Sequence, residues 1–143
     1  MSVKPAKKVL IVDDEPDILL MLRVDLEAEG YETSLAADGE TALRRISEDR
    51  PDLVLLDVMM PVIDGWGVLQ RMSGVGHQAP VVVVSAKASD LDAVRALELG
   101  ATDYVVKPFD PTLLLSRVAD VLSSTPGDLD TNRRRRLHEL TGN

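Results

Sequence analysis

The chain has 143 residues, a formal net charge of −8, 45% apolar residues and 3% aromatic residues. This length accommodates one domain plus a short tail, and the apolar content is high enough to build a core, which excludes wholesale disorder. The negative charge and the few aromatic residues argue against nucleic-acid binding by the body of the domain. The chain has no cysteine and no apolar run near the roughly 20 residues of a membrane span, which fits a cytoplasmic protein.

Short apolar runs alternate with helical patterns along the chain. Residues 9–12 are β-branched or leucine and predict a strand, after which Pro16 suits the first turn of a helix and Gly30 suits its end. Residues 31–36 predict a second, weaker strand. Asp38 is then a suitable N-cap for the next helix.

The second half of the chain continues the alternation. Residues 53–56 form an unbroken apolar run, typical of a strand that is buried on both faces. Residues 80–85 have the strongest β-propensity in the chain, and a capping box at 89–92 opens the helix after them. A short strand at 104–106 precedes a helix with Asp110 as its N-cap, which completes five strand–helix repeats.

This alternation predicts the fold class. Strands joined through helices form a parallel sheet with helices on both faces, because right-handed crossovers place them there. Four of the five runs are almost continuously apolar, as a doubly covered sheet requires. We therefore expect an open, doubly wound α/β domain, and the length excludes a closed eightfold barrel.

Polar groups gather at the carboxyl ends of the predicted strands. Asp13 and Asp14 follow the first strand, Asp57 follows the third, Ser85 ends the fourth and Lys107 follows the fifth. Ligands of open α/β sheets bind at this edge. Converging carboxylates repel one another, and a hard cation such as Mg²⁺ relieves that repulsion. Lys107 suits phosphate oxygens, and Asp57 is the best-placed nucleophile for a phosphoryl group.

The combination resembles the receiver domain of two-component response regulators, the CheY-like family. The resemblance covers about residues 7–123 and rests on five motifs that occur in order at the family's spacing. They are Val12-Asp13-Asp14-Glu15, Leu56-Asp57-Val58-Met59-Met60-Pro61 with Asp64-Gly65, Val84-Ser85-Ala86, Gly100-Ala101-Thr102-Asp103-Tyr104, and Lys107-Pro108-Phe109. It implies a flavodoxin-like (βα)5 fold with strand order 2-1-3-4-5, acting as a signalling switch rather than as an enzyme.

The resemblance also implies the chemistry at the sheet edge. A sensor histidine kinase or a phosphotransfer protein would donate a phosphoryl group to Asp57. The implied cofactor is Mg²⁺, with ligands from Asp13, Asp14, Asp57 and the backbone carbonyl of Met59. Lys107 would contact the phosphoryl oxygens.

Ser85 and Tyr104 are the implied parts of the switch. Ser85 would also contact the phosphoryl oxygens, and the peptide bond between Lys107 and Pro108 would be cis. Once Asp57 is phosphorylated, its oxygens attract the Ser85 hydroxyl, and Tyr104 turns into the space that Ser85 leaves. This movement would remodel the face made by the fourth helix, the fifth strand and the fifth helix, and so control an output domain or a partner protein.

That face also suggests a homodimer. Asp103 and Arg117 match one salt-bridge pair of the OmpR-like transcription factors, whose receivers dimerise there. Leu99 and Leu113 stand at two other positions that are charged in that set. Dimerisation of this type is therefore a hypothesis.

Residues 124–143 have the composition of a charged linker or tail. The run of four arginines at 133–136 could contact nucleic acid or another protein, but three acidic residues leave the tail with a net charge of only +1. We expect either a stand-alone receiver or, with slight preference, a fragment whose tail leads to an output domain.

Two other functions compete with the switch. A Mg²⁺-dependent phosphatase or phosphotransferase with an Asp nucleophile would need a second acid two positions later, where this chain has Met59. A flavin-binding protein would need a loop that holds phosphate after the first strand, but this loop is acidic. If the switch is correct, Met59 and Lys87 flank the entry of the attacking water and should tune the lifetime of the phosphoryl group.

Overall fold

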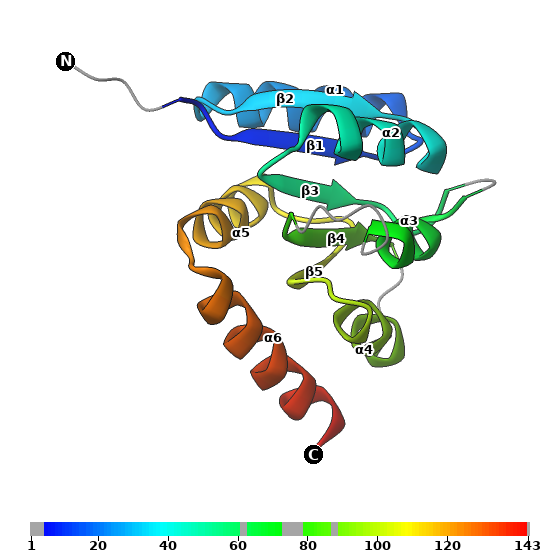
Figure 1. Ribbon diagram of the computed structural model, residues 1–143, viewed down its shortest axis with the longest axis vertical. Helices are drawn as coiled ribbons and strands as arrows, with labels where there is room; N and C mark the ends of the chain where they lie inside the picture. The colour runs from blue at the N-terminus through cyan, green and yellow to red at the C-terminus, as the bar shows by residue number, and fades with distance from the viewer. Residues whose placement is uncertain (1–4, 61–62, 73–78, 87–88, 143) are drawn as a thin grey trace.

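The computed structural model describes residues 5–60, 63–72, 79–86 and 89–142. In these ranges five strands alternate with five helices, and a sixth helix follows (Figure 1). The strands are β1 (Lys8–Val12), β2 (Glu32–Ala36), β3 (Leu53–Leu56), β4 (Val81–Ser85) and β5 (Asp103–Val106). The helices are α1 (Pro16–Ala28), α2 (Gly39–Asp49), α3 (Gly65–Met72), α4 (Asp90–Glu98), α5 (Pro111–Ser123) and α6 (Pro126–Thr141). Of the helices in the described residues, none is long and apolar enough to span a bilayer.

The strands form one parallel sheet in the order β2-β1-β3-β4-β5, which confirms the predicted fold. Val12, the last residue of β1, pairs with Ala36 of β2 and Leu56 of β3. The chain therefore leaves these neighbouring strands at the same level. As a result, the residues that follow β1 and β3 meet at one edge.

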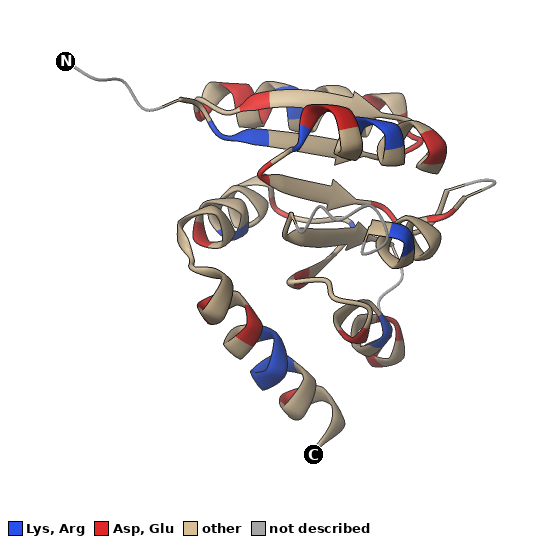
Figure 2. Cartoon of the chain, in the orientation of Figure 1, with Lys and Arg blue, Asp and Glu red and all other residues tan. Residues whose placement is uncertain are grey.

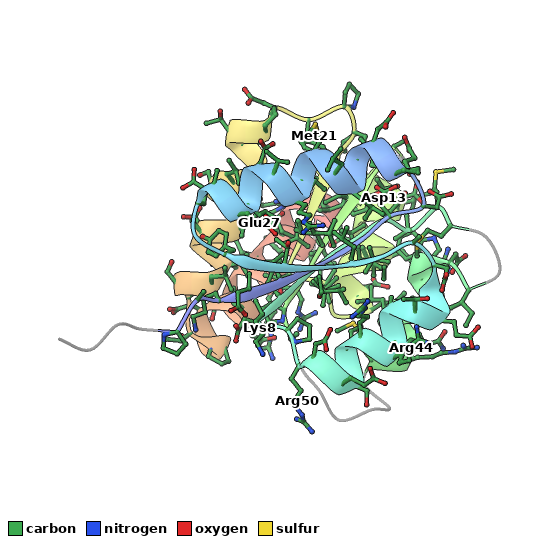
Figure 3. The ribbon with its side chains drawn as sticks, turned by 90° about the horizontal axis from the view of Figure 1, so that it is seen from above. Lys8, Asp13, Met21, Glu27, Arg44 and Arg50 are labelled. Carbon is green, nitrogen blue, oxygen red and sulfur yellow. The ribbon has the colours of Figure 1, made fainter. Side chains whose placement is uncertain are left out.

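The core has two layers, one on each face of the sheet. Successive strand residues point to opposite faces, so Val54 and Leu56 pack toward α2, α3 and α4, whereas Leu53 and Leu55 pack toward α1 and α5. Figure 3 shows α1 and α2 on opposite sides of the sheet, with Lys8 and Asp13 near the two ends of β1. Burial on both faces explains why the strand sequences are almost continuously apolar.

The predicted helix starts are confirmed. The side chains of Asp38, Ser89 and Asp110 each accept a hydrogen bond from a backbone N–H in the first turn of α2, α4 and α5. These bonds satisfy N–H groups that lack a partner within the helix. The glycines at 74 and 76, which the sequence favours as the end of the helix that follows β3, lie outside the described residues.

The predicted linker or tail contains an ordered helix. Thr125 caps α6 by accepting a hydrogen bond from the Asp128 N–H, and Gly142 ends the helix with a left-handed backbone, φ 74°. The helix contacts α4, which is distant in sequence. The division into a receiver at 7–123 and a linker at 124–143 stays a prediction.

Candidate functional site

Lys107 brings the ends of three strands together. Its Nζ lies 2.7 Å from Asp13 Oδ2, after β1, and 3.3 Å from Asp57 Oδ2, after β3. Lys107 itself follows β5, so the ammonium group reaches across the carboxyl edge of the sheet. The peptide bond between Lys107 and Pro108 is cis, as the resemblance implied.

The carboxylates around Lys107 form a cluster of four. Asp13, Asp14, Glu15 and Asp57 can each place one oxygen within 4.8 Å of the others. Asp13 and Asp57 are buried, whereas Asp14 and Glu15 are exposed. Glu15 directly precedes α1, and its carboxylate lies 3.5 Å from Lys107 Nζ. The sequence signal for Glu15 is its position directly after Asp13 and Asp14.

This cluster fits a hard divalent cation. All its candidate ligands are carboxylate oxygens, which magnesium and calcium prefer, and one ammonium does not balance four carboxylates. The buried pair faces an exposed pair, so a cation there could keep several water ligands, as Mg²⁺ does. The backbone carbonyl of Met59 as a further ligand stays a prediction.

Burial and charge perturb the two central groups in different ways. Burial raises the pKa of the Asp57 carboxyl, and the charge of Asp13 adds to this effect, while the Met59 N–H and Lys107 partly offset it. Burial alone would lower the pKa of Lys107, but Asp13 and Asp57 outweigh burial and raise it. Lys107 therefore stays charged at neutral pH, whereas the folded domain disfavours the anionic form of Asp57 relative to an exposed carboxylate, a cost that a bound cation would offset.

Ser85 and Tyr104 already contact each other. Ser85, the last residue of β4, is completely buried, and Tyr104 on β5 is only 7% exposed. Burial raises the pKa of the Tyr104 hydroxyl, and a side-chain hydrogen bond with Ser85 partly offsets that increase. We call this state, in which the Tyr104 side chain is buried beside Ser85, the Tyr104-in arrangement. The predicted turning of Tyr104 after phosphorylation stays a prediction.

Gly65 is a site residue whose role sequence reasoning missed. A Cβ on this first residue of α3 would lie 2.8 Å from the backbone carbonyl carbon of Asp57, and closer still to the Asp57 oxygen and the Val58 Cα. Only glycine allows α3 to begin this close to the chain that carries Asp57. The motif contained Gly65, but the close approach is a tertiary contact.

Comparisons with known proteins agree on one family. A family model described as response regulator receiver domain matches residues 9–119. The alkaline phosphatase synthesis transcriptional regulatory protein PhoP of Bacillus subtilis is 42% identical over 116 residues, which are 81% of this chain and 48% of PhoP. The chain thus spans about half the length of the curated relatives it matches.

Solved structures agree with the fold. The receiver domain of Francisella response regulator 1452 superposes with a TM-score of 0.78 at 33% identity, covering 81% of this chain and 96% of that domain. The BeF3-activated N-terminal receiver domain of Klebsiella pneumoniae RstA superposes with a TM-score of 0.78 at 31% identity, covering 82% of this chain and all of that domain.

Proposed function

Because the chain belongs to the response regulator receiver domain family, we propose that Asp57 is its phosphoacceptor. A receiver is a signalling switch of a two-component system rather than an enzyme that turns over a substrate. The phosphoryl donor in this proposal is a sensor histidine kinase or a phosphotransfer protein. One observation supports it above all: the Lys107 ammonium lies between the buried carboxylates of Asp13 and Asp57.

The proposed reaction transfers a phosphoryl group between two protein side chains. A carboxylate oxygen of Asp57 attacks the phosphorus of a phosphohistidine, and the P–N bond breaks. The electron pair of that bond stays on the imidazole nitrogen. Lys107 offsets the negative charge on the phosphoryl oxygens, so catalysis is mainly positioning and electrostatics.

We propose Mg²⁺ as the cofactor of this reaction. The ligands would be Asp13, Asp14, Asp57 and the backbone carbonyl of Met59. When bound, the ion supplies positive charge for the phosphoryl oxygens. The geometry of the carboxylate cluster supports this choice.

The proposed response passes from Ser85 to Tyr104 and on to the α4–β5–α5 face. In this proposal the Ser85 hydroxyl binds the phosphoryl group and so favours one arrangement of Tyr104 over another. The burial of both side chains on the paired strands β4 and β5 supports this route, because a movement of Ser85 changes the space open to Tyr104.

The output is an output domain or a partner protein that recognises this face. Several relatives are named as transcriptional regulatory proteins, which is the reason to propose such an output here. The kinase uses ATP, so we place the protein in the cytoplasm. A homodimer through α4–β5–α5 remains a proposal. In the structure Arg117 binds Asp103 of the same chain at 2.5 Å, so this ion pair would have to break before Arg117 could pair with Asp103 of a second chain.

The test is phosphoryl uptake from acetyl phosphate with Mg²⁺, followed by intact-protein mass spectrometry. Asp57→Asn should abolish uptake. Asp52→Asn is the matched control, because Asp52 precedes the same strand at its opposite end and binds the backbone N–H of Lys8. It should take up phosphate at the wild-type rate.

Two results would contradict the proposal. Full labelling of Asp57→Asn would place the acceptor elsewhere. Continued release of phosphate from a small-molecule ester, unaffected by the phosphorylation state of the chain, would favour the phosphatase alternative.

A further inference from the structure

Helix α6 crosses the open edge of the sheet at β5. It runs from the end of α5, past β5, toward α4 (Figure 1). Near its start, Leu129 packs against the core layer that contains α1 and α5. Near its end, Leu140 packs against the opposite layer, which contains α4 and Tyr104. The helix therefore joins the two layers across β5, although no residue of α6, all of which the structure describes, is itself buried.

Two arginines of α6 bind the domain. Arg133 Nη1 donates a hydrogen bond of 3.1 Å to the carbonyl oxygen of Leu97, in the last turn of α4, where a cation also complements the helix dipole. Arg136 Nη1 donates a bond of 3.0 Å to Asp103 Oδ1 on β5. Both contacts join residues more than 30 positions apart in sequence.

The other two arginines of the run are largely exposed and form no ion pair with the domain among the described residues. Arg134 and Arg135 have side chains that are 75% and 66% exposed. Within the described residues they form ion pairs only inside α6, with Asp130 and Glu139. The basic stretch on α6 in Figure 2 is thus divided between binding the domain and facing solvent.

Arg136 acts on the residue that positions Tyr104. The buried Asp103 carboxylate accepts Arg117 through Oδ2 and Arg136 through Oδ1. The same Oδ1 also accepts the backbone N–H of Tyr104 at 2.8 Å. β5 is an edge strand, so N–H groups on its outer side have no neighbouring strand to bind, and the Asp103 carboxylate supplies this partner. Arg136 therefore helps to fix the backbone of Tyr104, and Leu140 packs against the layer that holds its ring.

We propose that α6 is part of the phosphorylation switch, with Arg136 as a positioning residue that favours the Tyr104-in arrangement through Asp103. This rests on the proposed function, since Tyr104 reaches the phosphoryl site through Ser85. In the structure α6 is docked while the Tyr104 ring is buried beside Ser85, and an inward Tyr104 is the arrangement that phosphorylation is proposed to favour, so Arg136 and a phosphoryl group would stabilise the same state of the domain. The affinity of the site for a phosphoryl group therefore depends on α6, and a partner that pulled α6 away would weaken phosphorylation.

The experiment measures the affinity of the 143-residue chain for beryllofluoride, a phosphoryl mimic, in the presence of Mg²⁺. Binding is followed by the fluorescence of Trp66, the only tryptophan in the sequence. Trp66 follows Gly65, which lies against the backbone of Asp57 and Val58. Arg136→Gln should weaken beryllofluoride binding by about fivefold or more, the range typical of coupling between two sites. Its affinity for Mg²⁺ alone should stay unchanged, because the carboxylate cluster does not contact α6.

Arg135→Gln is the matched control. It removes the same charge from the next position of the same helix, but its partner is Glu139 rather than the domain. It should bind beryllofluoride as the wild type does, and Arg136→Lys should recover part of the loss. Equal affinities for Arg136→Gln and the wild type would overturn the inference. Equal losses for Arg135→Gln and Arg136→Gln would also overturn it, because they would indicate a general charge effect.

The reverse measurement follows from linkage. If α6 docking strengthens beryllofluoride binding, beryllofluoride must strengthen α6 docking by the same factor. Hydrogen exchange of the backbone amides in 126–141 should therefore slow in the wild type when beryllofluoride is added. Bound beryllofluoride without slower exchange would refute the coupling but leave the proposed function intact. A wild type that does not bind beryllofluoride would overturn both.

Discussion

Gly65→Ala tests the contact between α3 and the chain that carries Asp57. The new Cβ would lie 2.8 Å from the Asp57 carbonyl carbon, at least about 0.6 Å inside ordinary van der Waals contact, and it would meet two further backbone atoms at shorter distances. Backbone cannot rotate away as a side chain can, so α3 or the Asp57 segment has to shift. Overpacking of this kind costs about 1–3 kcal/mol, and we expect the upper end of this range. For a chain of this size that lowers the unfolding temperature by roughly 10 °C.

The same shift should reduce phosphorylation. A displacement of about 1 Å in a reacting group can reduce a rate by roughly 10²-fold. We therefore expect Gly65→Ala to take up phosphate from acetyl phosphate about two orders of magnitude more slowly, as measured by intact-protein mass spectrometry against time, while circular dichroism shows the folded state.

Gly67→Ala is the control in the same helix. Its Cβ would meet the Ile63 Cγ2 methyl at 3.1 Å and Asp64 Oδ1 at 3.6 Å, and no backbone atom of the described residues within 4 Å beyond its own local helix. Alanine also favours a helix interior by up to about 1 kcal/mol over glycine. We expect near wild-type stability and rate. Wild-type behaviour in Gly65→Ala would refute the reasoning, because the close approach would then have no consequence.

Three further predictions concern the site itself. Asp57→Asn should raise the unfolding temperature at neutral pH without Mg²⁺, because a raised pKa of Asp57 means that the folded state disfavours the charged carboxylate. This gain in unfolding temperature should vanish as the pH falls through the folded-state pKa, and a gain that persists in acid would contradict this cause. Lys107→Ala should lower the unfolding temperature at neutral pH, because it removes the ammonium group that pairs with Asp13 and Asp57. Added Mg²⁺ should restore part of the lost unfolding temperature, and thermal unfolding with and without the ion measures both effects. Met59→Asn and Lys87→Ala should change the dephosphorylation rate of the phosphorylated chain, because both residues are predicted to flank the entry of the attacking water. Met59 is half exposed, whereas Lys87 lies outside the described residues. Unchanged rates would contradict this role.

The sheet and the meeting of Asp13, Asp57 and Lys107 could be predicted because both follow from local patterns. An apolar run of four or five residues predicts a strand by itself, and parallel topology then places every carboxyl end at one edge. The predicted strand boundaries differ from the observed ones by at most one residue, as in 31–36 against Glu32–Ala36. Neither step requires knowledge of a long-range contact.

The roles of Gly65 and Arg136 could not be predicted in this way. Gly65 is defined by how close another segment approaches, which the sequence around it does not reveal. Arg136 is one of four consecutive arginines. Only the docking of α6 distinguishes the two arginines that bind the domain from the two that face solvent. Composition correctly predicts a charged tail, but it does not reveal which charged side chains bind the domain and which face solvent.

The two edges of the sheet differ in their tendency to aggregate. Residues 32–34 at the β2 edge are polar, whereas residues 104–106 at the β5 edge are Tyr-Val-Val. An open apolar edge is a template for pairing with a strand of another chain. Helix α6 docks at the start of this edge through the bond between Arg136 and Asp103, so we expect it to hinder such pairing. Loss of α6 docking should therefore reduce the solubility of the chain, and the same helix would serve both the switch and the resistance of the protein to aggregation.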